Sequence, residues 1–130
     1  MDGQTCENVV AALHGEAFAY ARYKLFAEAA RSRGDDRLAS MFDGIASAEL
    51  DEHFAELAEL ADLVGTDADN IRAALQDEDD EVEARYPEFA EQARSAGELA
   101  VAARFEEITE DEREHEKTLE QALERLEVPA

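Results

Sequence analysis

Apolar residues recur at steps of three and four along most of the 130-residue chain, which is the spacing of one face of an α-helix. Glycines at three places interrupt this pattern and separate long segments that contain few other helix breakers. The pattern predicts an all-α chain. Its four helices are expected over about residues 6–32, 35–64, 67–95 and 98–127, followed by a frayed tail at 128–130.

Residues with capping preferences mark the ends of these helices. Thr5 is predicted to cap the first helix, and Thr66 begins a motif that resembles a capping box for the third. Gly65 is expected to end the second helix as a C′ glycine. Because Pro87 lies inside the third helix, we predict a kink or break near Tyr86.

The chain also repeats itself at an offset of 63 residues, which a biased composition alone does not explain. The identical pairs are Tyr23/Tyr86, Phe26/Phe89, Ala27/Ala90, Glu28/Glu91, Ala30/Ala93, Arg31/Arg94, Gly34/Gly97, Phe42/Phe105, Ile45/Ile108 and Glu49/Glu112. We therefore predict two copies of a helical hairpin, about residues 6–64 and 67–127, in one domain spanning residues 1–130.

Each hairpin buries its apolar face only by packing on another hairpin, which predicts a four-helix bundle. The sequence does not decide whether the two hairpins pack within one chain or exchange between chains. The short turn at Gly34 and the longer connection at Gly65 are compatible with a homodimer whose hairpins are exchanged.

Charge restricts the partners of this chain. Thirty-four acidic residues face twelve basic ones, giving a net charge of −22, and only two of the basic residues are lysines. Such a charge opposes binding to nucleic acid and to anionic membrane surfaces, because phosphate groups would be repelled. An acidic surface with few lysines is typical of adaptation to high salt, where screening weakens self-repulsion.

Other features narrow the class of protein further. Cys6 is the only cysteine, which excludes internal disulfides and four-cysteine metal sites, and we expect it to be a buried thiol. No apolar run approaches the roughly 20 residues that span a bilayer. The first ten residues lack the pattern of a signal peptide, so we expect a cytoplasmic protein.

Glu112 and His115 stand three residues apart in the fourth predicted helix, so both can reach one point. Because glutamate is common in this chain, a solvated pair is the simpler interpretation of this spacing alone. The apolar context favours an inward orientation, since Phe105, Ile108 and Leu119 continue the same stripe. Buried carboxylates are costly unless they are paired or coordinate a metal.

The repeat supplies a second pair in the second predicted helix. Glu49 corresponds to Glu112, whereas the position of His115 is taken by Glu52, with His53 directly after it. An insertion of one residue, accommodated by the four-residue spacing or by a π-bulge, places His53 on the same face as Glu49. We expect His53 to be the ligand, with Glu52 as the alternative.

The remaining two helices supply carboxylates. Glu16 precedes Tyr23 by seven residues and Glu78 precedes Tyr86 by eight, so these glutamates correspond if one residue is inserted. Glu81 lies one turn beyond Glu78 on the same face. The acidic run around Glu78 is also typical of a solvated surface, but the repeat favours an inward orientation.

One glutamate from each of two helices and one Glu/His pair from each of the others form the ligand set of di-iron and di-manganese carboxylate bundles. Carboxylates with one imidazole per metal suit iron or manganese better than a closed thiolate zinc site. Two divalent cations also neutralise the inward carboxylates. The predicted metal ligands are Glu16, Glu49, His53, Glu78, Glu81, Glu112 and His115.

Several motifs resemble the di-iron domain of rubrerythrins, over about residues 5–126. They are Gly15-Glu16, Arg22-Tyr23, Phe26-Ala27, Tyr86-Pro87-Glu88-Phe89-Ala90 and Phe105-Glu106-Glu107-Ile108. The resemblance implies a ferritin-like four-helix bundle with these ligands, although the family has a histidine at the position of Glu52. It implies that Glu81 is the extra carboxylate that separates rubrerythrins from ferritins. It also implies that Tyr23 and Tyr86 lie near the metals as catalytic candidates, with simple core packing as the alternative.

The resemblance further implies peroxide chemistry. Rubrerythrins reduce hydrogen peroxide with electrons from a small redox protein, and most carry a rubredoxin module that this sequence does not contain. We therefore expect two Fe ions, with Mn as the alternative metal, a separate electron donor such as a rubredoxin, and a role in oxidative stress. The alternative functions are a ferroxidase or iron-handling ferritin-like protein and a structural helical bundle without turnover.

Overall fold

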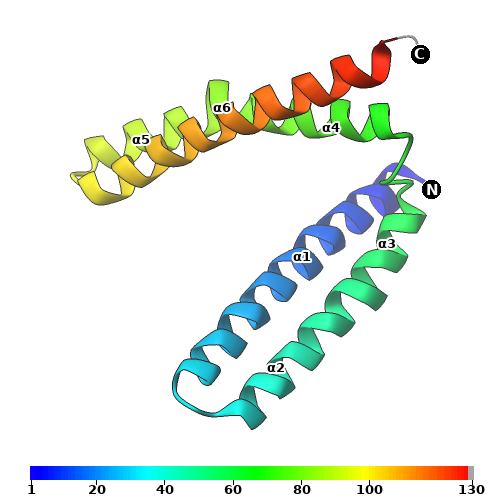
Figure 1. The fold of residues 1–130 in the computed structure, drawn as a ribbon, viewed down its shortest axis with the longest axis vertical. Coiled ribbons are helices and arrows are strands. Elements are labelled where there is room, and N and C mark those ends of the chain that lie inside the picture. Colours follow the sequence, from blue (N-terminus) through cyan, green and yellow to red (C-terminus); the bar gives the residue numbers. More distant parts are fainter. Residues whose placement is uncertain (129–130) are drawn as a thin grey trace. The chain divides into compact units, whose positions relative to one another are not determined.

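The first hairpin consists of one long helix and a returning helix in three parts. α1 spans Gly3–Ser32, and the chain returns as α2 (Asp36–Ala48), the π-helical segment η1 (Glu49–Phe54) and α3 (Ala55–Leu60). Figure 1 shows α1 lying along α2 and α3, and α1 contacts all three parts of the returning helix. The structure is a computed structural model that describes residues 1–128, so the last two residues of the predicted tail lie outside it.

In the second hairpin, the π-helical segment lies in the outgoing helix and not in the returning one. The chain runs out as α4 (Asp67–Asp80), η2 (Glu81–Arg85) and α5 (Tyr86–Ser95), and returns as α6 (Leu99–Glu127) along them (Figure 1). Contacts divide the chain into two compact units, residues 1–64 and 65–130, one for each hairpin. The all-α fold class with four helices in two hairpins is confirmed, whereas the joining of both hairpins in one domain stays a prediction.

The observed helix ends differ from the predicted ones at two places. Asp2, rather than Thr5, caps α1, because its carboxylate accepts a hydrogen bond from the Thr5 N–H at 2.8 Å. α3 ends at Leu60, four residues before the predicted end, and Asp62 adopts a left-handed φ of 49°. The prediction that Gly65 ends this helix was therefore wrong, since the left-handed residue stands three positions earlier.

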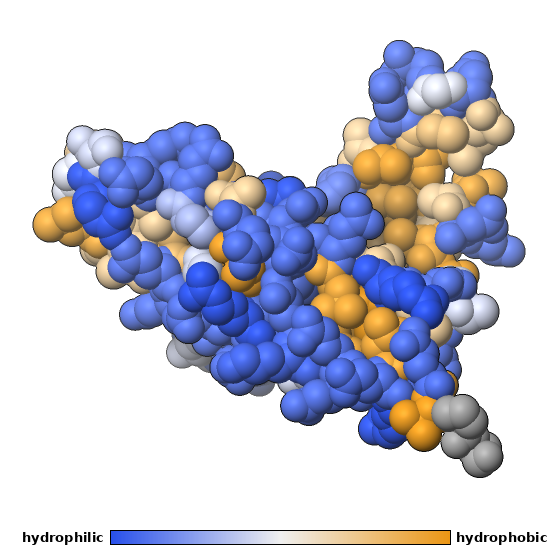
Figure 2. All heavy atoms as spheres, turned by 90° about the horizontal axis from the view of Figure 1, so that it is seen from above, coloured by the Kyte–Doolittle hydropathy of each residue, from blue (hydrophilic) through white to orange (hydrophobic). Residues whose placement is uncertain are grey.

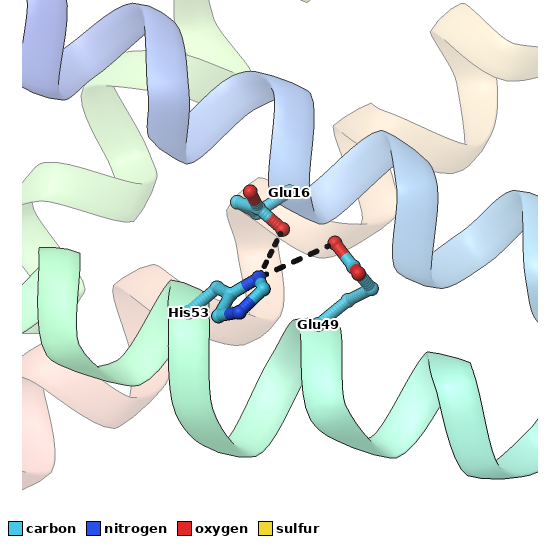
Figure 3. A group of neighbouring side chains, drawn as sticks. All are labelled: Glu16, Glu49 and His53. Atoms are coloured by element: carbon cyan, nitrogen blue, oxygen red, sulfur yellow. Dashed lines mark ion pairs between the residues drawn. The ribbon is translucent and has the colours of Figure 1, made fainter.

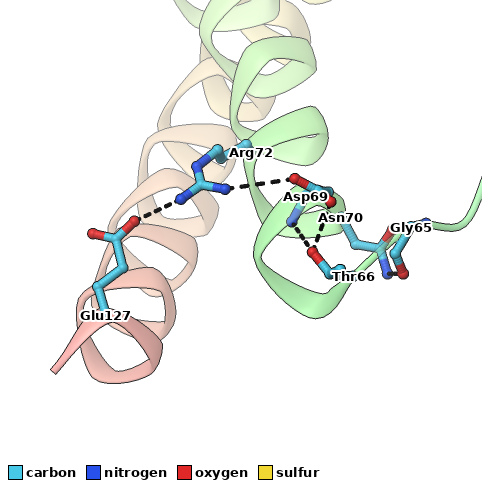
Figure 4. Close-up of polar contacts among 6 residues, drawn as sticks. All are labelled: Gly65, Thr66, Asp69, Asn70, Arg72 and Glu127. Atoms are coloured by element: carbon cyan, nitrogen blue, oxygen red, sulfur yellow. Dashed lines mark hydrogen bonds and ion pairs between the residues drawn. The ribbon is translucent and has the colours of Figure 1, made fainter. Parts of the chain in front are cut away.

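Two other local predictions are confirmed. The Thr66 hydroxyl accepts a hydrogen bond from the Asp69 N–H at 3.2 Å and caps α4 (Figure 4). Pro87 stands in the first turn of α5, directly after η2. The regular α-helical hydrogen bonding is thus interrupted where the proline was expected to interrupt it.

The two hairpins turn in the same way. Gly34 and Gly97 hold the left-handed position with φ of 81° and 80°, a conformation that glycine adopts without steric cost. In each turn the following residue donates its N–H to the carbonyl five residues earlier, in the pairs Asp35 with Ala30 (3.0 Å) and Glu98 with Ala93 (2.9 Å). The repeat seen in the sequence is therefore a repeat of backbone structure.

Small residues form much of the contact between helices inside each hairpin. The buried hydrophobic residues are Leu13, Ala27, Ala30, Ala39, Ala46, Val82, Ala90 and Ala102. Among the described residues, Val82 is the largest side chain that is fully buried. Larger apolar side chains such as Phe18 and Leu25 stay exposed, and Figure 2 shows apolar strips bordered by hydrophilic residues. Each hairpin therefore leaves a large apolar face uncovered.

Two remaining properties bear on the expected class of protein. Within residues 1–128, none of the helices combines the length and the apolar character needed to cross a membrane. Cys6 is exposed, so its expected burial was wrong. The residue lies in the first turn of α1, outside the alanine-rich contact between the helices.

Candidate metal centre

Three side chains of the first hairpin gather around one point (Figure 3). Glu16 comes from α1, whereas Glu49 and His53 come from η1 on the returning helix. One ligand atom from each residue lies within 4.8 Å of the other two. Nδ1 of His53 is 3.4 Å from Oε2 of Glu16 and 3.8 Å from Oε2 of Glu49. We call these three residues the first trio.

The second hairpin holds a matching group, which we call the second trio. Glu78 comes from α4, and Glu112 and His115 come from α6. Their ligand atoms also lie within 4.8 Å of one another. Nδ1 of His115 is 2.9 Å from Oε2 of Glu112 and 3.8 Å from Oε1 of Glu78. Each trio thus contains two carboxylates and one imidazole from two different helices.

The π-helical segment η1 explains why His53 reaches the first trio. A π-bulge absorbs one extra residue, so Glu49 and His53 stay on one face with one more residue between them than Glu112 and His115 have. The corresponding Glu112 and His115 are three positions apart in regular α-helix. Glu52 is exposed and lies outside the first trio, and its negative charge is the weakest of the causes that raise the pKa of His53.

Glu81 lies beside the second trio as the first residue of η2. Its side chain is 24% exposed, and one of its oxygens is 3.6 Å from an Arg85 guanidinium nitrogen. Burial raises the pKa of the Glu81 carboxyl, and the negative charge of Glu112 raises it further. Six of the seven predicted ligands thus lie in the two trios, and Glu81 lies outside them, near enough to the second trio for the charge of Glu112 to act on it.

The two predicted tyrosines lie in equivalent aromatic clusters. Tyr23 is 6.1 Å from both Phe26 and Phe42 between ring centroids. Tyr86 makes the same contacts with the residues 63 positions later, with ring centroids 6.1 and 5.8 Å apart. Tyr23 is seven residues beyond Glu16, about 10 Å along the helix. These clusters show packing, and a catalytic role for either tyrosine stays a prediction.

Both histidines are held by carboxylates. The nearby carboxylate of Glu16 is the main cause that raises the pKa of His53, and Glu49 adds to it. The hydrogen-bonded carboxylate of Glu112 is the main cause that raises the pKa of His115. The negative groups therefore favour the protonated imidazoles when no metal is bound.

The carboxylates perturb one another. A proton shared with Glu112 raises the pKa of Glu78 to about 7, and burial and the repulsion from Glu112 add to the shift. The same shared proton lowers the pKa of Glu112. In the first trio, a proton shared with Glu16 raises the pKa of Glu49, and burial adds to it. Paired inward carboxylates thus compete for protons in the metal-free protein.

The donor atoms fit a divalent cation. Oε2 of Glu16 and Oε2 of Glu78 are buried and have no hydrogen-bond partner. A buried carboxylate oxygen without a partner is costly, and a cation bound at each trio would satisfy it. Two carboxylates and one imidazole are also the ligand chemistry that iron and manganese accept.

Glu116 is a half-buried acid that the sequence analysis did not single out. Its Oε1 is buried without a hydrogen-bond partner, and burial is the main cause that raises its pKa, followed by repulsion from Asp79. The signal was present in the sequence, because Glu116 lies seven residues after Thr109 and fourteen after Ala102. Both of those residues are buried, so the heptad spacing points Glu116 to the same side of α6.

Comparison with known proteins relates the chain to a protein family. The sequence profile of the family described as Rubrerythrin matches residues 7–123. A rubrerythrin of Porphyromonas gingivalis is 35% identical over 127 residues, covering 88% of this chain and 63% of that protein. Rubrerythrin-1 of Clostridium acetobutylicum is 30% identical over 140 aligned positions, covering 95% and 72% of the two chains.

A third relative is named symerythrin. Symerythrin of Cyanophora paradoxa is 33% identical over 132 aligned positions, covering 80% of this chain and 73% of its own. This chain spans less than two thirds of the length of the Porphyromonas protein. The family profile nevertheless covers both hairpins and both trios. The chain therefore belongs to the rubrerythrin family.

Proposed function

We propose that this protein is a di-iron peroxidase that reduces hydrogen peroxide with electrons from a separate donor protein. The two trios are the observation that carries the proposal, because each gathers two carboxylates and an imidazole in a chain of the rubrerythrin family. A role in defence against oxidative stress follows from this activity. The location in the cytoplasm remains a prediction.

The seven proposed metal ligands are the six residues of the two trios together with Glu81. Glu49 and Glu112 each share a trio with a histidine of their own helix, while Glu16 and Glu78 come from the facing helices. Bound as a pair, two iron ions would supply the two electrons that, with two protons, convert hydrogen peroxide to two molecules of water. Manganese suits the same donors and is the alternative metal.

The residues of the site also handle protons. Because the pKa of Glu78 is raised to about 7, this carboxyl holds a proton near neutral pH when no metal is bound. The raised pKa values of His53 and His115 have the same effect on the imidazoles. A cation must displace these protons, so we expect metal binding to release protons and to weaken as the pH falls.

The test begins with metal content. The protein is loaded anaerobically with ferrous iron, and bound iron and the absorption spectrum after oxidation are measured. We expect two irons per chain, and loss of the pair in a double variant with Glu49→Ala and Glu112→Ala. Glu7→Ala is the matched control, because Glu7 is exposed and lies outside both trios. Less than one iron per chain would contradict the proposal.

The second stage separates peroxidase from ferroxidase activity. The ferrous protein is mixed rapidly with either hydrogen peroxide or oxygen, and oxidation of the site is followed by absorbance. A peroxidase reacts much faster with peroxide, and repeated turnover requires a reduced donor protein such as a rubredoxin. Faster reaction with oxygen, or iron accumulation beyond two per chain, would instead indicate a ferroxidase or iron-handling protein.

A further inference from the structure

We propose that the turn end of the first hairpin is the docking surface for an acidic redox protein. The surface consists of the turn between α1 and α2 and the first turns of α2, residues 33–41, and we call it the arginine turn (Figure 1). The inference rests on the proposed function, because it names where the electron donor of the proposed peroxidase binds and which charge that donor carries.

Positive charge is concentrated at this end of the first hairpin. All five basic residues of the first 64 lie between positions 22 and 37, together with three acidic residues, which gives this segment a net charge of +2. The segment 63 positions later, residues 85–100, holds two basic and three acidic residues, a net charge of −1. In a chain with a net charge of −22, residues 22–37 therefore offer a surface complementary to an acidic partner.

Two arginines of the arginine turn are not neutralised by the chain itself. Arg33 is the C-cap of α1 and Arg37 stands in the first turn of α2, and both are exposed. None of the ion pairs within residues 1–128 includes either of them, whereas Lys24 and Arg31 both bind Asp43, at 2.9 and 2.6 Å. The two guanidinium groups are therefore available to carboxylates of another molecule, which arginine binds in a two-pronged geometry.

A shallow hollow lies beside these charges. It has a volume of about 410 Å³ and is lined by Asp35, Arg37, Leu38 and Met41. Met41 is 49% exposed, so the hollow offers apolar contact next to the arginines. The Asp35 carboxylate is engaged as the N-cap of α2, where it accepts a hydrogen bond from the Leu38 N–H at 2.9 Å. An apolar centre with a charged border is typical of an interface with another protein.

The arginine turn lies on the same hairpin as the first trio and close to it. Met41 precedes Glu49 by eight residues, about 12 Å along the helix. The cluster of Tyr23, Phe26 and Phe42 lies between the turn and the trio along both helices, with ring centroids 5.5 to 6.1 Å apart. Electron tunnelling through protein falls steeply with distance, so this short separation suits a surface that receives electrons.

The second hairpin supplies an internal comparison, because it repeats the aromatic cluster without the arginines. Alanines stand at the two positions that correspond to the available arginines, Ala96 and Ala100. The counterpart of the exposed methionine is Arg104, which pairs with Glu107 at 2.8 Å. The turn at Gly97 thus lacks both the available positive charge and the apolar side chain, which assigns the docking to the first hairpin.

Direct binding tests the surface without relying on turnover. The probe is a rubredoxin of net negative charge that carries a fluorescent label, and its anisotropy is followed as the purified full chain is added in about 0.5 M KCl. This salt screens the long-range repulsion between two acidic proteins. We expect Arg33→Gln with Arg37→Gln to weaken binding about fivefold or more, because contacts of both guanidinium groups are lost. Both side chains are exposed, so this variant should fold.

Arg104→Gln with Arg125→Gln is the matched control. It removes the same number of positive charges from the second hairpin and leaves the arginine turn intact. We expect it to change the affinity less than about twofold, because distant exposed charges are screened. Equal weakening by both pairs would mean that only the net charge matters and would overturn the inference, as would wild-type protein that does not bind the rubredoxin at millimolar concentration.

Two further outcomes would assign the surface to another partner and equally overturn the inference. One is tighter binding of a short single-stranded DNA than of the rubredoxin, lost in the variant with Arg33→Gln and Arg37→Gln. The other is a lower molar mass of that variant by light scattering, which would make the arginine turn a contact between copies of the chain.

Peroxide turnover separates the inference from the proposed function. With iron-loaded protein and reduced rubredoxin, the half-saturating donor concentration should rise about fivefold or more in the variant with Arg33→Gln and Arg37→Gln, and stay near the wild-type value in the control. If the rubredoxin binds through the two arginines but no peroxide is reduced, the proposed function fails and the docking surface stands. If both variants turn over peroxide at the wild-type donor concentration, the docking surface is wrong and the proposed function stands.

Discussion

The two hairpins are alike in almost every feature except the position of one inserted residue. Both turn at a left-handed glycine, and both carry a cluster of one tyrosine and two phenylalanines. Arg31 pairs with Asp43 at 2.6 Å in the first hairpin, and Arg94 pairs with Glu106 at the same place in the second. The π-helical segment, however, lies in the returning helix of the first hairpin and in the outgoing helix of the second.

This difference shows how one repeat gives two trios with unequal surroundings. In the first hairpin the extra residue lies between Glu49 and His53, and the imidazole still joins the trio. In the second hairpin the extra residue lies beyond Glu78, where η2 presents Glu81 beside the second trio. Because π-bulges are frequent at functional sites, both insertions support the proposed placement of the ligands.

Deleting one residue should affect the two hairpins very differently. Removal of Glu52 lets η1 relax to regular α-helix and leaves Glu49 three positions before the histidine, as in the second hairpin. Removal of the corresponding Glu114 has no π-bulge to absorb it and turns the rest of α6 by about 100°. We expect the second deletion to destabilise the protein by about 3 kcal/mol or more and the first by much less.

Thermal unfolding of both deletion variants, with and without iron, measures this contrast. The deletion of Glu52 should keep paired iron, and the deletion of Glu114 should lose it because His115 leaves the face of Glu112. Equal loss of stability in both variants would show that η1 does not accommodate the deletion of one residue.

Substitution of the two neighbouring candidates in η1 gives the next largest effect. His53→Ala removes the imidazole of the first trio and should weaken iron binding by about 100-fold or more. Glu52→Ala removes only an exposed side chain, so the change should be smaller than about threefold. Iron titration followed by absorbance measures both affinities, and a reversed order would assign the ligand to Glu52.

Much of the fold was predictable because the relevant signals are local. The helices follow from apolar spacing, the turns from glycines at positions 34 and 97, and the interruption before α5 from Pro87. The end of α3 was missed because Asp62, a residue with a Cβ, takes the left-handed position that a glycine was expected to hold. The placement of the hairpins against each other depends on long-range packing, which no local signal carries.

The composition of the trios was predictable for a different reason. A single Glu-x-x-His pair is weak, but the repeat at offset 63 selects a few glutamates out of a strongly acidic chain. The spacing alone admits both Glu52 and His53, whereas the backbone structure places His53 in the first trio. Glu116 was missed because the selection rested on identical residues at offset 63, and its counterpart at that offset is His53, a different residue type.

The pH dependence of the metal-free protein distinguishes the trios by a smaller effect. The folded-state pKa of Glu78 is raised to about 7, so the folded protein binds this proton more tightly than the unfolded chain does. Stability should therefore fall as the pH rises through about 7, and the raised pKa values of both histidines act in the same direction. In the presence of a chelator, we expect melting temperatures a few degrees higher at pH 6 than at pH 8.

Two variants test whether Glu78 causes this change of melting temperature with pH. Glu78→Gln removes the titrating carboxyl and should reduce the difference in melting temperature between the two pH values. Glu7→Gln removes one exposed charge far from the trios and should leave the difference unchanged. If both variants change the difference in melting temperature equally, the pH dependence comes from the net charge of the chain and not from the site.

Salt should have the smallest effect on the melting temperature, and charge substitutions in the two hairpins should change that effect by different amounts. The first 64 residues hold 13 acidic and 5 basic side chains, while residues 65–130 hold 21 and 7, giving net charges of −8 and −14. The Debye length, over which charges act on one another, shortens to about 3 Å at 1 M salt. Because this weakens the repulsion between the acidic side chains, the melting temperature should rise between 0.1 and 2 M KCl. Glu120→Gln with Glu124→Gln should reduce this rise more than Glu7→Gln with Glu56→Gln, because self-repulsion is concentrated in the second hairpin. A melting temperature independent of salt in the wild-type protein would mean that the acidic surface is not an adaptation to high salt, and equal effects of the two pairs would remove the distinction between the hairpins.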